Sequence, residues 1–189
     1  MRIIAGSHRG RRLSGPQGTI LRPTSDKVRE ALFSILGSQI PGARFLDLYA
    51  GTGAVGIEAL SRGATSVTFV ESDHKAVQLL QRNLQTCQLH HQAHVRVGQT
   101  ATFLKRTEWW DGPYDILFAD PPYAAADQLD ILIHAWRPGL LSEDATVIIE
   151  QDSRTILPAS IDHATLVRRY EYGDTALSLY RLSAESTSS

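Results

Sequence analysis

Four consecutive residues, Asp120, Pro121, Pro122 and Tyr123, carry the clearest chemical signal in this sequence. They follow an apolar run over 115–119 that is typical of a short buried strand, so the carboxylate is expected at the strand's carboxyl end. Each proline lacks an N–H and has a fixed φ, which makes a stiff loop whose carbonyl groups are free to point outward. A carboxylate, a free carbonyl and an aromatic face held this close together suit a planar group that carries an exocyclic amine.

The chemistry expected of this loop is activation of that amine. An amine on an aromatic base is a poor nucleophile because its lone pair is delocalised into the ring. If Asp120 and the Pro121 carbonyl accept its two N–H bonds, the nitrogen becomes more tetrahedral and its lone pair is directed toward an electrophile. Tyr123 can stack on the base. Such catalysis relies on positioning and on stabilising positive charge, not on a general base.

A second motif lies upstream, where an apolar strand leads through a glycine-rich turn into a helix. Gly51, Gly53 and Gly56 satisfy the pattern G-x-G-x-x-G, and Glu71 follows Gly51 by 20 residues at the end of another apolar run. This is the fingerprint of a nucleotide-type ligand whose ribose hydroxyls hydrogen-bond the acid. Gly51, Thr52 and Gly53 are then expected against the ligand.

A glycine fingerprint alone also fits a nicotinamide cofactor, or a turn that serves only helix–strand packing. Asp47, just before the turn, argues otherwise, because an acid is a poor neighbour for a pyrophosphate. It suits a cofactor that bears an ammonium and a sulfonium, namely S-adenosylmethionine. Gln99, after the third strand, could accept a bond from the adenine amine, although such enzymes often carry an acid there. The predicted cofactor-binding residues are Asp47, Gly51, Thr52, Gly53, Glu71 and Gln99.

Positive charge is concentrated at the N-terminus. Residues 1–30 contain seven lysines and arginines and two acidic residues, whereas the whole chain has a net charge of −1. This asymmetry is expected of a nucleic-acid-binding arm, and a solvated charged loop is the simpler alternative. The segment 8–12 is flanked by apolar residues, as in a small hairpin. The candidate phosphate contacts are Arg9, Arg11, Arg12, Arg22 and Arg29.

The remaining sequence alternates between strand-like and helix-like segments. Strands are expected over 45–48, 67–70, 95–97, 115–119, 146–150, 164–172 and 177–182, and helices over 26–36, 55–60, 76–84, 102–106 and 129–136. The pattern predicts a Rossmann-like α/β fold, with a mostly parallel seven-stranded sheet, helices on both faces and an antiparallel C-terminal hairpin. Both motifs then lie at carboxyl ends of neighbouring strands, where open α/β sheets bind ligands.

Composition narrows the class of protein. A hydrophobic content of 42% and a charged content of 21% are ordinary for a globular domain. No apolar run approaches the roughly 20 residues that span a bilayer, and the N-terminus has no signal-peptide core, so a cytoplasmic protein without membrane contact is expected.

Cys87 is the single cysteine, which excludes an internal disulfide. Cys87, His90, His91 and His94 have metal-like spacing, but no second cluster completes a site, so no metal is expected.

Several segments together resemble the bacterial 16S rRNA guanine-N2 methyltransferase family. They are Arg22–Thr24, Val28–Phe33, Asp47–Gly56, Val70–Asp73, Asp120–Tyr123 and Tyr172–Thr175. The resemblance implies methyl transfer from S-adenosylmethionine to the exocyclic amine of one guanine in 16S rRNA, in the cytoplasm and during assembly of the small subunit. It divides the chain into a basic RNA-binding arm and helix (1–40), a methyltransferase domain (41–182) and a disordered tail (183–189).

Two alternatives share these motifs. N6-methylation of adenine in DNA or RNA would use the same proline loop, but the lack of a separate target-recognition domain argues against sequence-specific work on DNA. A non-catalytic RNA-binding module could keep the fold, but the intact Asp120–Tyr123 argues against it. In the main interpretation, Asp120 and the Pro121 carbonyl hold the guanine amine while Tyr123 stacks on a base flipped out of its helix.

Overall fold

A computed structural model of the protein describes residues 1–15, 26–122 and 125–183. Its elements are, in chain order, α1 (Asp26–Leu36), η1 (Gly37–Gln39), β1 (Arg44–Leu48), α2 (Ala54–Ser61), β2 (Ser66–Glu71), α3 (His74–Cys87), η2 (His90–Gln92), β3 (Ala93–Val97), α4 (Thr100–Lys105), η3 (Thr107–Trp109), β4 (Tyr114–Ala119), α5 (Ala125–His134), β5 (Leu141–Asp152), β6 (Ser160–Ile161), β7 (Ala164–Tyr172) and β8 (Thr175–Leu182).

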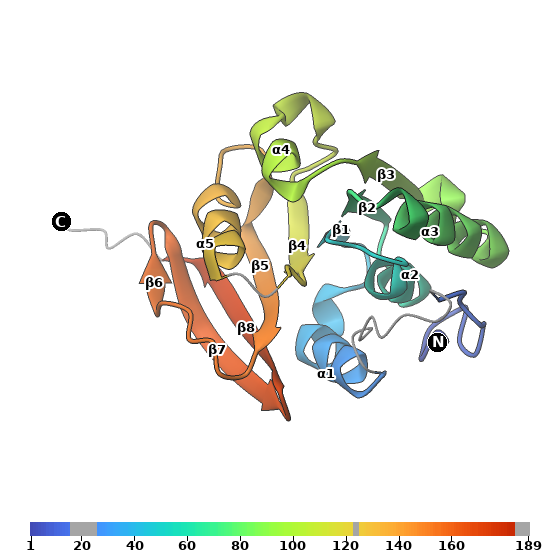
Figure 1. Ribbon diagram of the computed structural model, residues 1–189, viewed down its shortest axis with the longest axis horizontal. Coiled ribbons are helices and arrows are strands. Elements are labelled where there is room, and N and C mark those ends of the chain that lie inside the picture. Colours follow the sequence, from blue (N-terminus) through green and yellow to red (C-terminus); the bar gives the residue numbers. More distant parts are fainter. Residues whose placement is uncertain (16–25, 123–124, 184–189) are drawn as a thin grey trace.

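All described strands form one sheet in the order β3-β2-β1-β4-β5-β8-β7-β6 (Figure 1). Strands β1 to β5 are parallel to their neighbours among themselves, and β8 pairs antiparallel with both β5 and β7. The expected Rossmann-like sheet with an antiparallel C-terminal hairpin is therefore confirmed. The expected number of strands was wrong by one, because β6 is only two residues long and too short to show a periodic pattern.

Several element boundaries also differ from the expectation, most of all those of β5 and α5. Strand β5 begins at Leu141, which pairs with Tyr114 of β4 ahead of a register shift, although residues 141–144 are partly or fully exposed and show no apolar alternation. Helix α5 begins at Ala125 and ends at His134, earlier at both ends than the apolar spacing suggested. Pairing with β4 thus extends β5 beyond its apolar residues, whereas α5 is shifted toward the N-terminus.

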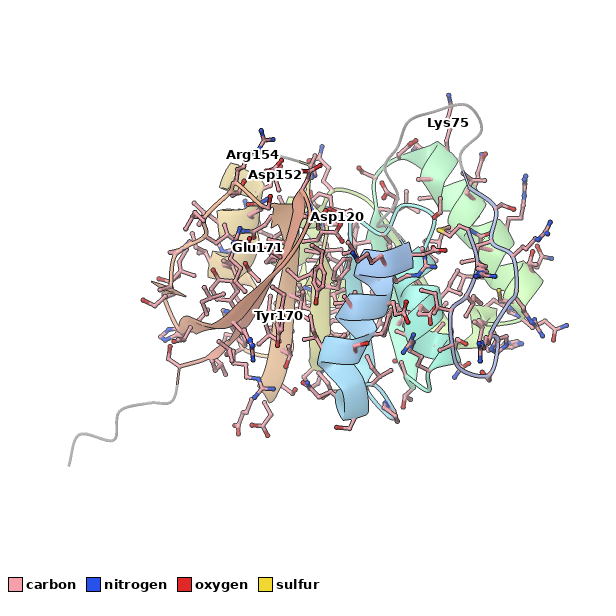
Figure 2. The ribbon with its side chains drawn as sticks, turned by 90° about the horizontal axis from the view of Figure 1, so that it is seen from below. Lys75, Asp120, Asp152, Arg154, Tyr170 and Glu171 are labelled. Carbon is pink, nitrogen blue, oxygen red and sulfur yellow. The ribbon has the colours of Figure 1, made fainter. Side chains whose placement is uncertain are left out.

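The sheet is covered on both faces, each with its own hydrophobic cluster. One cluster joins Phe45, Phe69 and Phe118 of the sheet to apolar residues of α1, α2 and α3, such as Leu32 and Leu80. The other cluster joins alternate residues of the same strands to α4 and α5. Figures 1 and 2 show α1 and α5 on opposite sides of β4 and β5. The near-continuous burial of β1, β2 and β4 is what a parallel sheet covered on both faces requires.

The N-terminus forms the expected small hairpin. Arg2 and Arg12 make an antiparallel bridge, Ile3 N–H donates to the Arg11 carbonyl at 3.0 Å, and Leu13 N–H donates to Met1. Ile3 and Leu13 are buried in the cluster that also holds α1, α2 and α3. The boundary expected at residue 40 therefore does not separate two hydrophobic cores.

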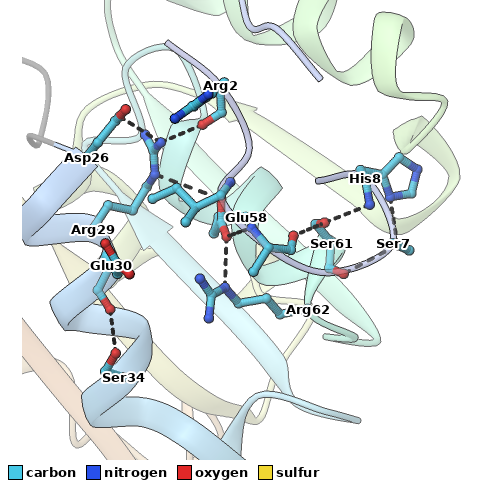
Figure 3. Close-up of polar contacts among 12 residues, drawn as sticks. Arg2, Ser7, His8, Asp26, Arg29, Glu30, Ser34, Glu58, Ser61 and Arg62 are labelled. Carbon is cyan, nitrogen blue, oxygen red and sulfur yellow. Dashed lines mark hydrogen bonds and ion pairs between the residues drawn. The ribbon is translucent and has the colours of Figure 1, made fainter. Parts of the chain in front are cut away.

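A buried carboxylate on α2 holds this hairpin in place. Glu58 is fully buried and accepts hydrogen bonds from Ile4 N–H at 2.7 Å and from Ala5 N–H at 2.9 Å (Figure 3). Arg62 donates to the same carboxylate at 2.8 Å, and the Arg29 guanidinium lies 3.9 Å from it. A buried charge is tolerated when it is paired and hydrogen-bonded in this way. Glu58 thus joins the hairpin and α1 to α2.

A second contact at the end of α2 requires a glycine in the hairpin. Gly6 has φ of +82°, and a Cβ there would lie 1.8 Å from the Ser61 carbonyl oxygen. The Ser61 hydroxyl donates to the Ala5 carbonyl at 2.6 Å and accepts from His8 N–H at 3.0 Å. The tip of the hairpin is therefore fixed at the C-terminal end of α2.

Replacement of Glu58 by alanine is expected to lower the free energy of unfolding by about 3 kcal/mol, because it leaves two backbone N–H groups without their acceptor and removes the charge that pairs with Arg62 and lies beside the buried Arg29. Urea denaturation measures this change, and hydrogen exchange at Ile4 and Ala5 should accelerate. Glu30→Ala, an exposed position on α1, is the control and should stay within about 0.5 kcal/mol of wild type. Equal unfolding midpoints for Glu58→Ala and wild type would show that the carboxylate does not hold the hairpin.

Candidate active site at the carboxyl edge of the sheet

The register of three parallel strands brings the two sequence motifs to one place. Leu48 of β1 pairs with Val70 of β2 on one side and with Ala119 of β4 on the other. The next residues along the three strands, Tyr49, Glu71 and Asp120, therefore lie at the same level at the carboxyl edge of the sheet. Figure 2 shows Asp120 at the same end of the molecule as Lys75, in the first turn of α3.

The turn between β1 and α2 has the geometry that its glycines predicted. Gly51 and Gly53 have φ of +54° and +79°, in the left-handed region that favours glycine. A Cβ on Gly53 would lie 2.2 Å from a methyl carbon of Leu80, and one on Gly56 would lie 2.3 Å from the Phe69 ring. The first two glycines therefore shape the turn, and Gly56 lets α2 pack closely on β2.

Two acidic side chains bind main-chain N–H groups of this turn. The Glu71 carboxylate accepts from Gly51 N–H at 2.7 Å, and the Asp47 carboxylate accepts from Gly56 N–H at 2.9 Å. Asp47 is only 1% exposed, so it lies beneath the turn and not on the open surface where direct contact with a cofactor was expected. Glu71 remains partly exposed and can still reach a ligand.

Sequence reasoning missed a third side chain that contacts the turn. Asn83 of α3 is 1% exposed and donates through Nδ2 to the Thr52 carbonyl at 3.0 Å. An asparagine in a helix that otherwise shows an amphipathic pattern gives no local signal of this contact, which depends on how α3 packs beside the turn.

Burial of carboxylates makes this edge favourable for a cation. Burial, together with the nearby charges of Asp120 and Glu71, raises the pKa of Asp47 to about 7, against the opposing effect of the Gly56 N–H bond. Burial also raises the pKa of Asp120 to about 6. A buried carboxylate whose negative charge lacks a cationic partner is stabilised when a positive ligand binds beside it. This electrostatic pattern suits a sulfonium and an ammonium.

A pocket opens beside the ends of β2 and β3. Its volume is about 300 Å³, which lies at the lower end of the range of roughly 300–1,000 Å³ for small-molecule sites. It brings Glu71 and Gln99 together, as expected of residues that bind the ribose and the adenine of one nucleoside. The lining residues are Tyr49, Val70, Glu71, Ser72, Gly98, Gln99, Thr100, Ala101 and Asp127.

Tyr49 and Asp127 are among the lining residues that were not expected from the sequence. Tyr49 has φ of +60°, a conformation that is unfavourable for a bulky side chain, and it hydrogen-bonds Thr100. Burial raises the pKa of the Tyr49 hydroxyl, and the nearby charge of Asp127 raises it further. The backbone strain of Tyr49 has no sequence signature. Asp127 could have been suspected, because it follows the proline loop by only a few residues.

The proline loop lies where the strand pattern placed it. Asp120 directly follows β4 and is partly buried, Pro121 is buried and Pro122 is exposed. Tyr123, the expected stacking residue, lies outside the described residues, so the proposed aromatic face rests on the sequence.

The arginines expected to bind phosphate separate into different groups. Arg9, Arg11 and Arg12 are exposed on the N-terminal hairpin, although Arg11 also donates to the Cys87 carbonyl at 3.1 Å. Arg22 lies outside the described residues. The expectation for Arg29 requires correction, because its side chain is fully buried.

Arg29 has a structural role in its place. Its Nη2 donates to the Arg2 carbonyl at 2.6 Å and to the Asp26 carboxylate at 3.0 Å, and its guanidinium lies beside Glu58 (Figure 3). The positive charge that the sequence assigned to an RNA surface is therefore used inside the protein.

The described residues contain neither a metal-like cluster nor a membrane-spanning helix. No three or more His, Cys, Asp or Glu side chains in this part of the chain are grouped so that they could hold a metal ion. None of its helices is both long and apolar enough to cross a bilayer.

A Rossmann-like sheet whose carboxyl edge carries a glycine turn, an acid after the second strand and an Asp-Pro-Pro loop defines an S-adenosylmethionine-dependent methyltransferase. The chain belongs to the family described as "Conserved hypothetical protein 95", whose profile matches residues 1–181. The family resemblance expected from the sequence is thereby confirmed.

Relatives of the chain support the same class. It is 36% identical to "Ribosomal RNA small subunit methyltransferase D" of Escherichia coli K12, over 100% of this chain and 93% of that protein. It is also 36% identical to "Putative rRNA methyltransferase YlbH" of Bacillus subtilis, over 96% of this chain and 98% of that protein. Among solved structures, "Putative methyltransferase yhhF" of Escherichia coli matches 98% of this chain and 99% of its own, with a TM-score of 0.85 and 36% identity.

The raised pKa of Asp47 predicts a pH-dependent gain of stability on Asp47→Asn. The folded-state pKa of about 7 lies above the unfolded value of about 3.9, so ionisation lowers the stability of wild type increasingly as the pH rises from 4 to 7, and fully above 7. The amide oxygen of asparagine can still accept from Gly56 N–H. We expect the Asp47→Asn variant to be more stable than wild type by on the order of 1–4 kcal/mol at pH 8 and by almost nothing at pH 4.

Urea denaturation of the protein without cofactor at both pH values measures this difference. The exposed Asp144→Asn is the control and should show no pH-dependent gain. A variant that is equally stable or less stable than wild type at pH 8 would mean that the buried carboxylate is not costly to ionise.

Proposed function

We propose that this protein transfers a methyl group from S-adenosylmethionine to the exocyclic N2 amine of a guanine in 16S rRNA. The observation that carries the proposal is the position of Asp120. Its carboxylate lies at the same level of the sheet edge as Glu71, with the glycine turn between them, so an amine bound by the proline loop would meet a cofactor bound in the pocket. The full-length similarity to a small-subunit rRNA methyltransferase supports the choice of RNA.

The residues present fit S-adenosylmethionine. Glu71 would bind the ribose hydroxyls and Gln99 the adenine amine, and the support for this is that both line one pocket. Apart from Gly51 and its two chain neighbours, no described residue has an atom within 4 Å of where a Cβ on Gly51 would be, so the turn leaves open space for the methionine part. The buried carboxylates of Asp47 and Asp120 favour its positive charges. Bound S-adenosylmethionine supplies an electrophilic methyl group.

The proline loop prepares the attacking amine. Asp120 accepts one N–H of the guanine amine and the Pro121 carbonyl accepts the other, so the nitrogen lone pair points toward the methyl carbon. As the new N–C bond forms and the methyl–sulfur bond breaks, leaving a neutral thioether, positive charge develops on the nitrogen next to the Asp120 carboxylate, which stabilises it. The surplus proton then leaves the nitrogen by way of this carboxylate or water. Tyr123 stacks on the flipped base.

The hairpin arginines would bind RNA outside the pocket but beside the glycine turn. The hairpin tip is held at the C-terminal ends of α2 and α3. Ser14, two residues after Arg12, is bonded to the same Asn83 side chain that holds Thr52 of the turn. The substrate we propose is a folded rRNA within an assembling small subunit, in the cytoplasm, and the full-length similarity to a small-subunit rRNA methyltransferase supports it.

A comparison of substrates tests the proposed function. The protein is incubated with labelled S-adenosylmethionine and, in separate reactions, naked 16S rRNA, small-subunit particles or DNA. Label is expected in the rRNA, most rapidly in particles. Label in DNA alone would instead favour the alternative of a DNA adenine methyltransferase.

Asp120→Ala should reduce single-turnover methylation on the order of 100-fold or more, because the carboxylate accepts a hydrogen bond from the guanine amine. Affinity for S-adenosylhomocysteine should stay within about twofold of wild type.

In wild type the methylation rate should rise with pH through about 6 and then level off, since only ionised Asp120 accepts both the N–H bond and the proton. Asp120→Asn keeps an acceptor oxygen, so it should retain partial activity and lose the inflection near pH 6. Alanine and wild type reacting at equal rates would exclude the amine-holding role.

Replacing Arg9 and Arg12 together by alanine should weaken RNA binding and its dependence on salt. Each lost phosphate contact lowers the slope of log affinity against log salt by roughly 0.7–0.9, so the slope should fall by about 1.4–1.8. Filter binding over a salt series gives both quantities. A matched control is Arg168→Ala with Arg181→Ala, two exposed arginines on the C-terminal hairpin, which should leave the slope unchanged. If the two double variants behave alike, the N-terminal hairpin is not an RNA surface.

A further inference from the structure

We propose that Asn83 links the N-terminal hairpin to the glycine turn, so that binding of RNA at the hairpin strengthens binding of the cofactor. Asn83 is a positioning residue in this proposal and touches neither ligand. The proposal rests on the proposed function in one respect, namely that the hairpin binds the RNA substrate.

The first half of the link is the contact between Asn83 and the hairpin. Asn83 Oδ1 accepts from Ser14 N–H at 2.7 Å, and Asn83 Nδ2 donates to the Ser14 carbonyl at 3.0 Å. One side-chain amide thus binds both main-chain polar groups of a single hairpin residue. Ser14 follows Arg12 by two residues, with the buried Leu13 between them, so a change in the backbone at the exposed arginines is passed to it along the chain.

The second half of the link is the contact between Asn83 and the cofactor turn. The same Nδ2 donates to the Thr52 carbonyl at 3.0 Å, and Thr52 lies between the two glycines of positive φ. The amide has two N–H bonds, and the two carbonyls of Ser14 and Thr52 use both of them. Because Asn83 is 1% exposed, water does not readily replace either partner. Movement of Ser14 therefore displaces the group that holds Thr52.

The other anchors of the turn lack this connection. Glu71 and Asp47 hold Gly51 and Gly56 from the ends of β2 and β1, which are fixed in the sheet. Asn83 contacts the turn from a helix and also contacts the hairpin. Of these three contacts, it is the one through which the hairpin can alter the turn.

The rest of the hairpin is docked independently of Ser14. Its first strand and tip, residues 4–8, are bound by Glu58 and Ser61 of α2. Loss of the contact between Ser14 and Asn83 should therefore leave the hairpin on the protein and its arginines available. This separation makes the link testable without removal of the RNA surface.

The link predicts coupling that acts in both directions. If RNA raises the affinity for the cofactor by some factor, the cofactor must raise the affinity for RNA by the same factor. For wild type we expect a factor of about fivefold or more, at the lower end of typical coupling between sites.

Three variants test the link with S-adenosylhomocysteine as the ligand, so that no turnover occurs, and a 16S rRNA fragment that the wild type methylates as the RNA. Ser14→Pro removes the N–H that Asn83 accepts. Ser14→Ala is its matched control, because the contacts of Ser14 with Asn83 use only main-chain atoms. Asn83→Ala removes both halves of the link. Calorimetry measures the affinity for S-adenosylhomocysteine with and without saturating RNA.

We expect Ser14→Ala to retain the wild-type coupling. Ser14→Pro should keep the wild-type affinity for S-adenosylhomocysteine without RNA, within about twofold. It should lose most of the strengthening by RNA, because only the bond from Asn83 Nδ2 to the carbonyl of residue 14 remains. Asn83→Ala should bind S-adenosylhomocysteine several-fold more weakly without RNA, because Thr52 loses a buried hydrogen bond, and should also lose the coupling. If Asn83→Ala fails to fold, the pair of Ser14 variants still decides.

Either of two results would overturn the link. One is a wild-type protein that methylates the RNA yet binds S-adenosylhomocysteine equally with and without it. The other is full coupling in Ser14→Pro. Failure of the proposed function would look different, because wild type would then neither bind nor methylate the RNA.

Discussion

The parallel register of β1 with β2 and β4 is the constraint on which the site depends. Because Leu48 is level with both Val70 and Ala119, the residues that follow all three strands come to one edge without any direct bond between them. The same register places Asp47 on the face covered by α2, where it reaches Gly56 N–H. A slip of β1 by one residue would turn Asp47 and Phe45 to the opposite face and separate the glycine turn from Asp120.

Two buried carboxylates serve different purposes in this structure. Glu58 is paired with arginines and main-chain N–H groups, and it joins the hairpin and α1 to α2. Asp47 has a single hydrogen bond and neighbours of like charge, so its ionised form is unfavourable until a cation arrives. The protein thus places a well-compensated charge where it needs rigidity, and a poorly compensated charge where it binds a positive ligand. Stability is lower at the functional site as a consequence.

Much of the fold and the centre of the site could be predicted from the sequence. Apolar runs marked the seven longer strands, and the positions of Gly51, Glu71 and Asp120 at strand ends were enough to bring both motifs to one edge. These features are local, because each depends on a short pattern and on the rule that parallel strands share an edge.

Other features depend on contacts between distant segments and left no such pattern. Arg29 looked like part of a basic surface, but the packing of α1 against the hairpin buries it beside Glu58. Asn83 looked like an ordinary polar residue in an amphipathic helix, and Tyr49 like any residue before a glycine turn. Their roles follow from how α3 and the turn lie in three dimensions, which composition and spacing do not specify.

The central claim is that the amine held by Asp120 belongs to guanine. Mass spectrometry of nucleosides, after small-subunit particles lacking the modification are incubated with the protein and S-adenosylmethionine, tests it most directly. N2-methylguanosine is the expected product, and it should be absent when the protein carries Asp120→Ala. Formation of N6-methyladenosine in its place, or of N2-methylguanosine by the Asp120→Ala variant at the wild-type rate, would contradict this account of the site.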